Sequence, residues 1–152
     1  MSIEYNFEIE MIIPDKLNNV FAFFSTADNL QIITPPWLHF IILTPTPLEI
    51  QKGRIIDYKL SLYGFPFKWQ TEITVWNPPH QFIDEQIKGP YRKWKHLHYF
   101  ESRGNQTYMR DHVTYEIPVF PKILNKLFVS KNVEQIFNYR RKKINEIFNG
   151  SS

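Results

Sequence analysis

The chain contains no cysteine among its 152 residues. This absence excludes disulfide bonds, thiolate nucleophiles, zinc fingers and clusters held by cysteine, and it agrees with a reducing compartment. No apolar run approaches the roughly 20 residues that a membrane-spanning helix needs. Residues 1–4 also lack the basic and apolar regions that open a secretory signal. We therefore expect a cytoplasmic protein without membrane insertion.

Positive charge is in small excess, because the chain has 18 basic and 15 acidic residues and a net charge of +3. This balance does not favour nucleic acid, and we expect no nucleic-acid partner. A basic run at residues 140–143 is typical of a solvated helix end, where cations meet the negative end of the helix dipole. Binding of nucleic acid or of an anionic membrane surface by this run is the alternative.

The chain has no glycine-rich phosphate loop, dinucleotide fingerprint or Gly-x-Ser-x-Gly elbow. We therefore expect no cofactor and no serine-hydrolase chemistry. Aromatic residues, in contrast, are abundant at 16%. With 43% hydrophobic and 22% charged residues the composition is that of one globular domain over residues 1–152. The aromatic side chains must fill a core or line a cavity.

Hydrophobic periodicity predicts the order of the elements. Residues 3–13 alternate between apolar and polar, which indicates a strand with one buried face. Two short helices should follow, one beginning at Pro14 and one capped by Asp28 and ending before Pro35. The further predicted strands are residues 38–44, 54–63, 67–76, 81–87, 93–101 and 107–117. Apolar spacings of three, four and seven then predict one long amphipathic helix over residues 122–148. The fold class is therefore α+β, with an antiparallel meander.

The turns between these strands predict their pairing. A hairpin centred on Gly104-Asn105 places His98 opposite Asp111. The other turns predict the following opposite pairs: Asp84 with His96, Gln86 with Trp94, Phe82 with His98, Ile73 with Asp84, Val75 with Phe82, Leu60 with Trp69, and Tyr58 with Thr71. All of these registers give the strands one shared inner face, and a slip of one residue would turn a whole strand over.

The shared inner face carries a polar island inside an aromatic wall. The island comprises Arg54, Asp84, Gln86, His96, His98 and Asp111. The wall comprises Tyr58, Trp69, Phe82, Trp94, Phe100 and Tyr115. Buried polar groups are costly unless they are satisfied, so this combination predicts a ligand cavity lined by these twelve residues.

His98 with Asp111, and His96 with Asp84, are the candidates for proton-transfer chemistry, because a carboxylate fixes the tautomer of a histidine. We expect a direct hydrogen bond between His98 and Asp111. Pairs that only brace the sheet, or that orient a ligand, are the alternatives. His96 and His98 with one carboxylate could also chelate a metal, but we predict no structural metal.

Two arginines could join the island. Arg54 shares the predicted row of His98, so we expect it to pair with Asp111 or with a ligand carboxylate. Arg140 interrupts the apolar face of the last helix. It would either reach the island or extend its head to solvent.

The chain resembles the START-like, birch-pollen-allergen-like helix-grip superfamily (SRPBCC) of the polyketide cyclase/dehydrase type. The resemblance rests on the element order and on two stretches, residues 82–100 with the pattern Phe-x-Asp-x-Gln-x-x-Gly-Pro-Tyr-x-x-Trp-x-His-x-His-x-Phe and residues 107–118. It is similar to a bacterial subgroup of small stand-alone domains, also found fused to cell-division-inhibitor proteins. The resemblance implies a curved seven-stranded antiparallel sheet wrapped around the long C-terminal helix, with two short helices after the first strand and a hydrophobic cavity.

Superfamily members bind lipids, hormones or polyketides, and some are cyclases or dehydratases. The resemblance and the polar island together predict binding of an apolar or aromatic small molecule, lipid- or polyketide-like, between the sheet and the C-terminal helix. The first alternative is a cyclase or dehydratase that uses a His–Asp pair in the same cavity. The second is a protein-interaction module that uses the sheet edge or the basic helix.

Overall fold

The computed structural model describes residues 2–45 and 48–149, and the other positions of the predicted domain lie outside the described residues. The strands are β1 (Glu4–Ile13), β2 (Ile41–Ile42), β3 (Ile55–Leu62), β4 (Phe65–Asn77), β5 (Gln81–Lys88), β6 (Lys93–Arg103) and β7 (Gln106–Glu116). The helices are α1 (Leu17–Phe24), α2 (Ala27–Ile33), the 3₁₀ turn η1 (Pro36–Leu38), α3 (Pro121–Leu124), the π turn η2 (Asn125–Val129) and α4 (Ser130–Phe148).

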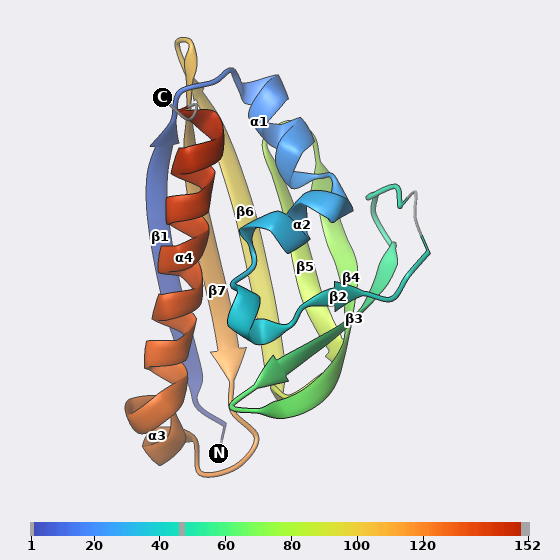
Figure 1. The fold of residues 1–152 in the computed structure, drawn as a ribbon, viewed down its shortest axis with the longest axis vertical. Coiled ribbons are helices and arrows are strands. Elements are labelled where there is room, and N and C mark those ends of the chain that lie inside the picture. The colour runs from blue at the N-terminus through green and yellow to red at the C-terminus, as the bar shows by residue number, and fades with distance from the viewer. Residues whose placement is uncertain (1, 46–47, 150–152) are drawn as a thin grey trace.

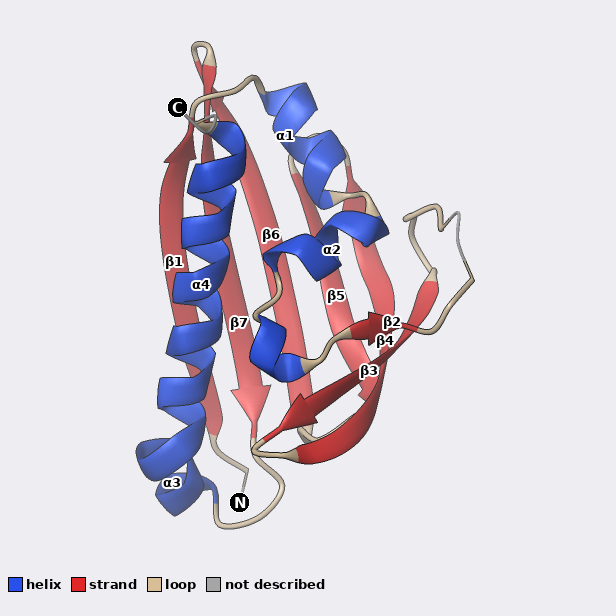
Figure 2. Cartoon of the chain, in the orientation of Figure 1, coloured by secondary structure: helices blue, strands red, loops and turns tan. Residues whose placement is uncertain are grey.

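The seven strands form one antiparallel sheet in the order β1-β7-β6-β5-β4-β3-β2. The sheet curves, and α4 runs along its concave face on the side of β1 and β7 (Figure 1). Helices α1 and α2 continue this layer over the other half of the sheet (Figure 2). The predicted helix-grip architecture is therefore confirmed, including the two short helices after the first strand.

Two of the predicted registers are confirmed. In the β6–β7 hairpin His98 lies opposite Asp111. In β5–β6 Asp84 lies opposite His96, but the ladder ends at Glu85 with Lys95, so the predicted pairing of Gln86 with Trp94 is wrong. The predicted inner face is correct at these strands, because His98 is buried on the side of the helices.

The β3–β4 register differs by two residues from the prediction. Leu60 lies opposite Phe67 and Tyr58 opposite Trp69, because a two-residue turn at Tyr63-Gly64 replaces the expected longer one. Both turn residues have positive φ, 53° and 81°, as a tight hairpin of this kind requires. A shift of two residues leaves every side chain on its predicted face.

An irregularity between Ile73 and Val75 shifts the β4–β5 ladder by one residue. Ile73 still lies opposite Asp84, but Val75 lies opposite Ile83 and not opposite Phe82. Such a bulge leaves a residue of one strand without a partner and bends the strand, which suits a curved sheet.

The predicted strand over residues 38–44 is wrong for most of its length. Pro36–Leu38 form a 3₁₀ turn, and only Ile41–Ile42 pair with β3. The cause is local, since Pro36 fixes a φ that suits the start of a turn and His39 takes a left-handed conformation with φ 48°.

The predicted C-terminal helix is a continuous helical run with one π turn in it. Its α4 segment buries Val133, Phe137 and Ile144 against the sheet, at the spacing that the sequence predicts. Among the described residues, no helix is both long and apolar enough to cross a lipid bilayer.

Gly104 is needed for its backbone conformation. Its φ is 66°, and a Cβ at this position would meet no atom within 4 Å. We expect Gly104→Ala to lower the free energy of unfolding by about 1 kcal/mol, because a side chain disfavours the left-handed region. Urea unfolding would measure it. Asn105→Ala is the matched control in the same turn, and an equal loss in both variants would contradict the conformational explanation.

Candidate functional site

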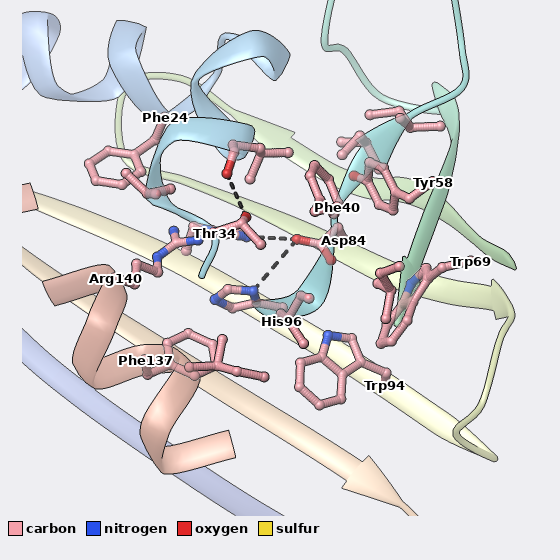
Figure 3. A pocket seen from close by; sticks show the side chains of 18 of the residues that line it. Phe24, Thr34, Phe40, Tyr58, Trp69, Asp84, Trp94, His96, Phe137 and Arg140 are labelled. Carbon is pink, nitrogen blue, oxygen red and sulfur yellow. Dashed lines mark hydrogen bonds and ion pairs between the residues drawn. The ribbon is translucent and has the colours of Figure 1, made fainter. Parts of the chain in front are cut away.

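A pocket of about 160 Å³ lies between the sheet, α2, η1 and α4. Its walls are mostly aromatic and aliphatic, with a polar group on one side (Figure 3). The aromatic lining comprises Phe24, Phe40, Tyr58, Trp69, Phe82, Tyr91, Trp94 and Phe137, and the polar lining comprises Thr34, Asp84, His96, His98 and Arg140.

The structure places seven of the twelve predicted site residues in this lining and five elsewhere. The seven are Tyr58, Trp69, Phe82, Asp84, Trp94, His96 and His98. The five that do not line the pocket are Arg54, Gln86, Phe100, Asp111 and Tyr115. The roles of all twelve in binding stay predictions.

The two histidines and two aspartates form crossed hydrogen bonds. His98 Nε2 lies 2.6 Å from Asp84 Oδ2, and His96 Nε2 lies 2.7 Å from Asp111 Oδ1. The partners that face each other across the ladder are farther apart, at 3.6 Å from His98 Nδ1 to Asp111 Oδ1 and 3.8 Å from His96 Nδ1 to Asp84 Oδ2. The predicted hydrogen bond between His98 and Asp111 is therefore wrong, although their side chains are neighbours.

The geometry of the imidazoles explains the crossed pattern. The rings of His96 and His98 stack with centroids 3.7 Å apart, and Phe82 stacks on His98 at 4.1 Å. Stacked in this way, each ring directs Nε2 toward the diagonal carboxylate, which long side chains on paired strands can reach. The four residues thus act as one buried network.

Burial and charge set the protonation of this network. Burial alone would raise the pKa of Asp111, but the guanidinium of Arg140 and the hydrogen bond from His96 hold that pKa well below its usual range. Burial opposes ionisation of Asp84 in the same way, and the hydrogen bond from His98 and the charges around it lower its pKa. For His98, burial lowers the pKa to about 4. At neutral pH the network therefore holds two carboxylates and a neutral His98, and of the two carboxylates Asp84 lines the pocket.

Arg140 reaches the network from α4. Its Nη2 lies 3.6 Å from Asp111 Oδ1, and only 8% of the residue is exposed. Its Nε and Nη2 have no hydrogen-bond partner in the described part of the chain. The guanidinium also lies 5.4 Å from the ring of Phe24. The sequence left its direction open, and the structure shows it pointing inward (Figure 3).

Arg54 does not belong to the site. Its Nε donates to the backbone oxygen of Glu49 at 2.8 Å, in an exposed position just before β3. The expected pairing with Asp111 is wrong, because β6, β5 and β4 lie between β3 and β7 in the sheet, and sharing a row in the pattern does not bridge that separation. Arg140 holds the position beside Asp111 that the prediction gave to Arg54.

Gln86 supports the pocket from outside it. Its Nε2 donates to the backbone oxygen of Tyr91 at 2.6 Å, and the backbone nitrogen of Tyr91 donates to Gln86 Oε1 at 3.2 Å. These bonds hold the β5–β6 turn so that Tyr91 lines the pocket. Phe100 is fully buried in the core beside Phe24. Tyr115 donates its hydroxyl to Asn125 Oδ1 at 2.5 Å.

The lining from α2, η1 and the chain after them was missed by the sequence reasoning. Leu30, Ile33 and Thr34 come from the end of α2 and Leu38 and Phe40 from around η1. The sequence shows only that apolar residues lie on both sides of Pro35 and Pro36. This pattern does not specify which face of a short helix turns toward the sheet.

Asp84, His96 and His98 also offer donor atoms that all lie within 4.8 Å of one another. A metal there would have to displace the hydrogen bond between His98 and Asp84, and the guanidinium of Arg140 lies beside the same network. The expected absence of a structural metal stays a prediction.

No protein-family model and no curated protein sequence matches the chain. Solved structures do match it over most of their length. A protein from Arthrobacter aurescens has a TM-score of 0.72 at 12% identity, covering 97% of this chain and 87% of its own. Major latex-like protein 151 from Panax ginseng has a TM-score of 0.70 at 10% identity, covering 95% and 97%.

Norcoclaurine synthase from Thalictrum flavum, solved in complex with dopamine and hydroxybenzaldehyde, has a TM-score of 0.69 at 13% identity. It covers 99% of this chain and 90% of its own. At these identities the likeness concerns the backbone. The chain has the same helix-grip fold as these proteins, which is the fold that the resemblance in the sequence implies.

Proposed function

We propose that this protein binds an aromatic small molecule in the pocket between the sheet and α4. The observation that carries the proposal is the aromatic lining, with Asp84, His96 and Arg140 gathered on one wall. Apolar walls with a few convergent polar groups are typical of small-molecule sites. A protein of the same fold, norcoclaurine synthase, has been solved with two small aromatic molecules bound.

The volume of the pocket narrows the class of ligand. A cavity of about 150 Å³ lined by apolar side chains is known to hold benzene. At about 160 Å³ this pocket is therefore suited to a compound of one or two rings. Within the lipid- or polyketide-like range predicted from the sequence, the volume favours a small aromatic over a long acyl chain.

The polar wall would fix the orientation of such a ligand. The side chain of Asp84 is 20% exposed, so its carboxylate can accept a hydrogen bond from a ligand hydroxyl. Arg140 also lines the pocket, so its guanidinium can donate to a ligand oxygen. A phenol or an aromatic carbonyl compound satisfies these groups, which a hydrocarbon would leave unpaired.

Filling the pocket should abolish binding. Ile136 lines the pocket from α4, whereas Ile147 lies farther along the same helix and is 39% exposed. We expect Ile136→Trp to weaken binding of 4-hydroxybenzaldehyde, measured by calorimetry, at least tenfold, because the larger side chain takes up the space. Ile147→Trp is the matched control and should bind like the parent protein. Equal affinity in both variants, or tighter binding of hexadecanoate than of the aldehyde, would contradict the proposal.

Catalysis by a His–Asp pair is the second candidate. It is favoured by the ionised Asp84 carboxylate, which lines the pocket and is held by the neutral His98. A carboxylate in this position could remove a proton next to a ligand carbonyl group. Exchange of the methyl protons of acetophenone in D₂O, followed by NMR, should then be accelerated by the parent protein and not by Asp84→Asn. If acetophenone binds but its methyl protons exchange at the uncatalysed rate, the catalytic candidate is wrong and only the binding function is retained.

A further inference from the structure

Large apolar side chains are exposed together at one end of the molecule. This apolar tip comprises the β3–β4 turn, the chain between β7 and α3, and the segment α3–η2 (lower end of Figure 1). Its exposed residues are Tyr63, Phe65, Val119, Phe120, Ile123, Leu127 and Phe128, each between 49% and 75% exposed. Single exposed apolar residues are common, but a contiguous group marks an interaction surface.

Two of the three parts of the apolar tip, the β3–β4 turn and the segment α3–η2, touch each other. The rings of Tyr63 in the β3–β4 turn and Phe128 in η2 lie 6.0 Å apart, edge to face. Phe120 is the most exposed member, at 75%, and its φ is 45°. A left-handed conformation is costly for a bulky residue. No core contact accounts for it among the described residues, since the ring points to solvent.

In the two sequence segments that form the apolar tip, every charged residue is a lysine. Residues 117–133 contain three lysines, Lys122, Lys126 and Lys131, and no acidic residue. Residues 58–71 contain two lysines, Lys59 and Lys68, and also no acidic residue. The acidic residues that flank the first stretch are Glu116 and Glu134. Glu4, near the start of β1, is engaged by Lys93 at 2.8 Å.

We propose that the apolar tip docks this protein onto an anionic lipid surface. Exposed aromatic and aliphatic side chains flanked by lysines match an interface of acyl chains below negative headgroups. A second copy of the chain fits less well, because it would bring the lysines of these segments against the same lysines of the other copy. The docked chain lies on the bilayer and does not span it, which agrees with the lack of a spanning helix in the described residues.

The position of the apolar tip gives this docking a consequence for the pocket. The pocket-lining residues Tyr58 and Leu60 lie on β3, which leads directly into the turn at Tyr63 in the tip. Docking would therefore bring one wall of the pocket next to the bilayer, from which an apolar ligand could enter. The docking itself depends only on the surface residues and stands independently of the ligand.

Sedimentation with vesicles tests the proposal. We expect the parent protein to bind phosphatidylcholine vesicles that contain about 30% phosphatidylserine and to bind pure phosphatidylcholine at least tenfold less. Replacing Phe120 and Leu127 together by serine should reduce binding at least tenfold, and Lys122→Glu with Lys126→Glu should remove the preference for phosphatidylserine. The matched control is Ile12→Ser with Ile32→Ser, at exposed isoleucines away from the tip, and it should bind like the parent.

All these positions are more than 40% exposed or carry lysine, so the variants should keep the parent melting temperature. Absence of vesicle binding by the folded parent protein would overturn the proposal, as would equal loss in the control variant. Self-association that the serine variant abolishes, without vesicle binding, would assign the tip to a second copy and also overturn it. Ile136→Trp should still bind vesicles, which separates this test from that of the pocket.

Discussion

Asp111→Ala should lower the free energy of unfolding by about 3–5 kcal/mol, because it leaves a buried cation without its partner. Asp111 is 4% exposed and accepts a hydrogen bond from His96, while Arg140 approaches within 3.6 Å. Without the carboxylate, the guanidinium would stay buried beside the rings of Phe24 and Phe137, with Asp84 as the remaining negative charge near it. Urea unfolding at neutral pH would measure the loss.

A surface carboxylate provides the comparison. Glu101 pairs with Arg103 Nε at 3.1 Å, but both side chains are about half exposed. Exposed pairs contribute at most about 1 kcal/mol, so Glu101→Ala should have a small effect. The double variant Asp111→Leu with Arg140→Met should recover much of the stability, because it removes both charges at once. The single variants Asp111→Leu and Arg140→Met complete the cycle, and a loss in the double variant equal to the sum of their two losses would show that Asp111 and Arg140 are not coupled.

The strand registers near the site followed from turn chemistry in the sequence. Gly104-Asn105 permits one tight turn, so the pairing of His98 with Asp111 could be derived. The β3–β4 turn was harder, because Tyr63 is not a residue that ordinarily takes positive φ. The error was two residues, which preserved the faces and with them the composition of the inner wall.

The hydrogen bonds inside the site could not be derived in the same way. Register fixes which residues are neighbours, but the choice between the opposite and the diagonal carboxylate depends on side-chain torsions and on ring stacking. Arg54 and Arg140 illustrate a second limit. Their distance from Asp111 depends on the curvature of the sheet and on the rotation of α4 about its axis. The hydrophobic period of two residues in a strand or 3.6 residues in a helix specifies neither.

The stability of the protein should decrease by about 3 kcal/mol between pH 7 and pH 4 through His98. Burial lowers the pKa of His98 to about 4 in the folded chain, against about 6.5 in the unfolded chain. Above pH 6.5 neither state is protonated at this residue. As the pH falls from 6.5 to 4, the unfolded chain takes up a proton that the folded chain does not, so unfolding is favoured.

The groups that face His98 determine how the pH dependence continues below this range. His96 opposes a second positive charge, while Asp84 and Asp111 favour one, and burial outweighs them. The pKa values of Asp84 and Asp111 are both lowered in the folded chain. Their contribution to the free energy of unfolding is therefore fully present above about pH 4, the pKa of aspartate in the unfolded chain, and is lost only as the pH falls further. The interval between pH 7 and pH 4.5 therefore reports mainly on His98.

His98→Gln separates this contribution from the rest, because glutamine keeps a donor for Asp84 and has no proton to gain. We expect the difference in unfolding free energy between pH 7 and pH 4.5, measured with urea, to shrink by about 2–3 kcal/mol in this variant. His80→Gln, at an exposed turn, should leave the difference unchanged. The same pH dependence in His98→Gln as in the parent would mean that His98 is readily protonated in the folded chain. The network would then carry a positive charge at this position, and the ionised Asp84 would no longer face the pocket beside a neutral imidazole.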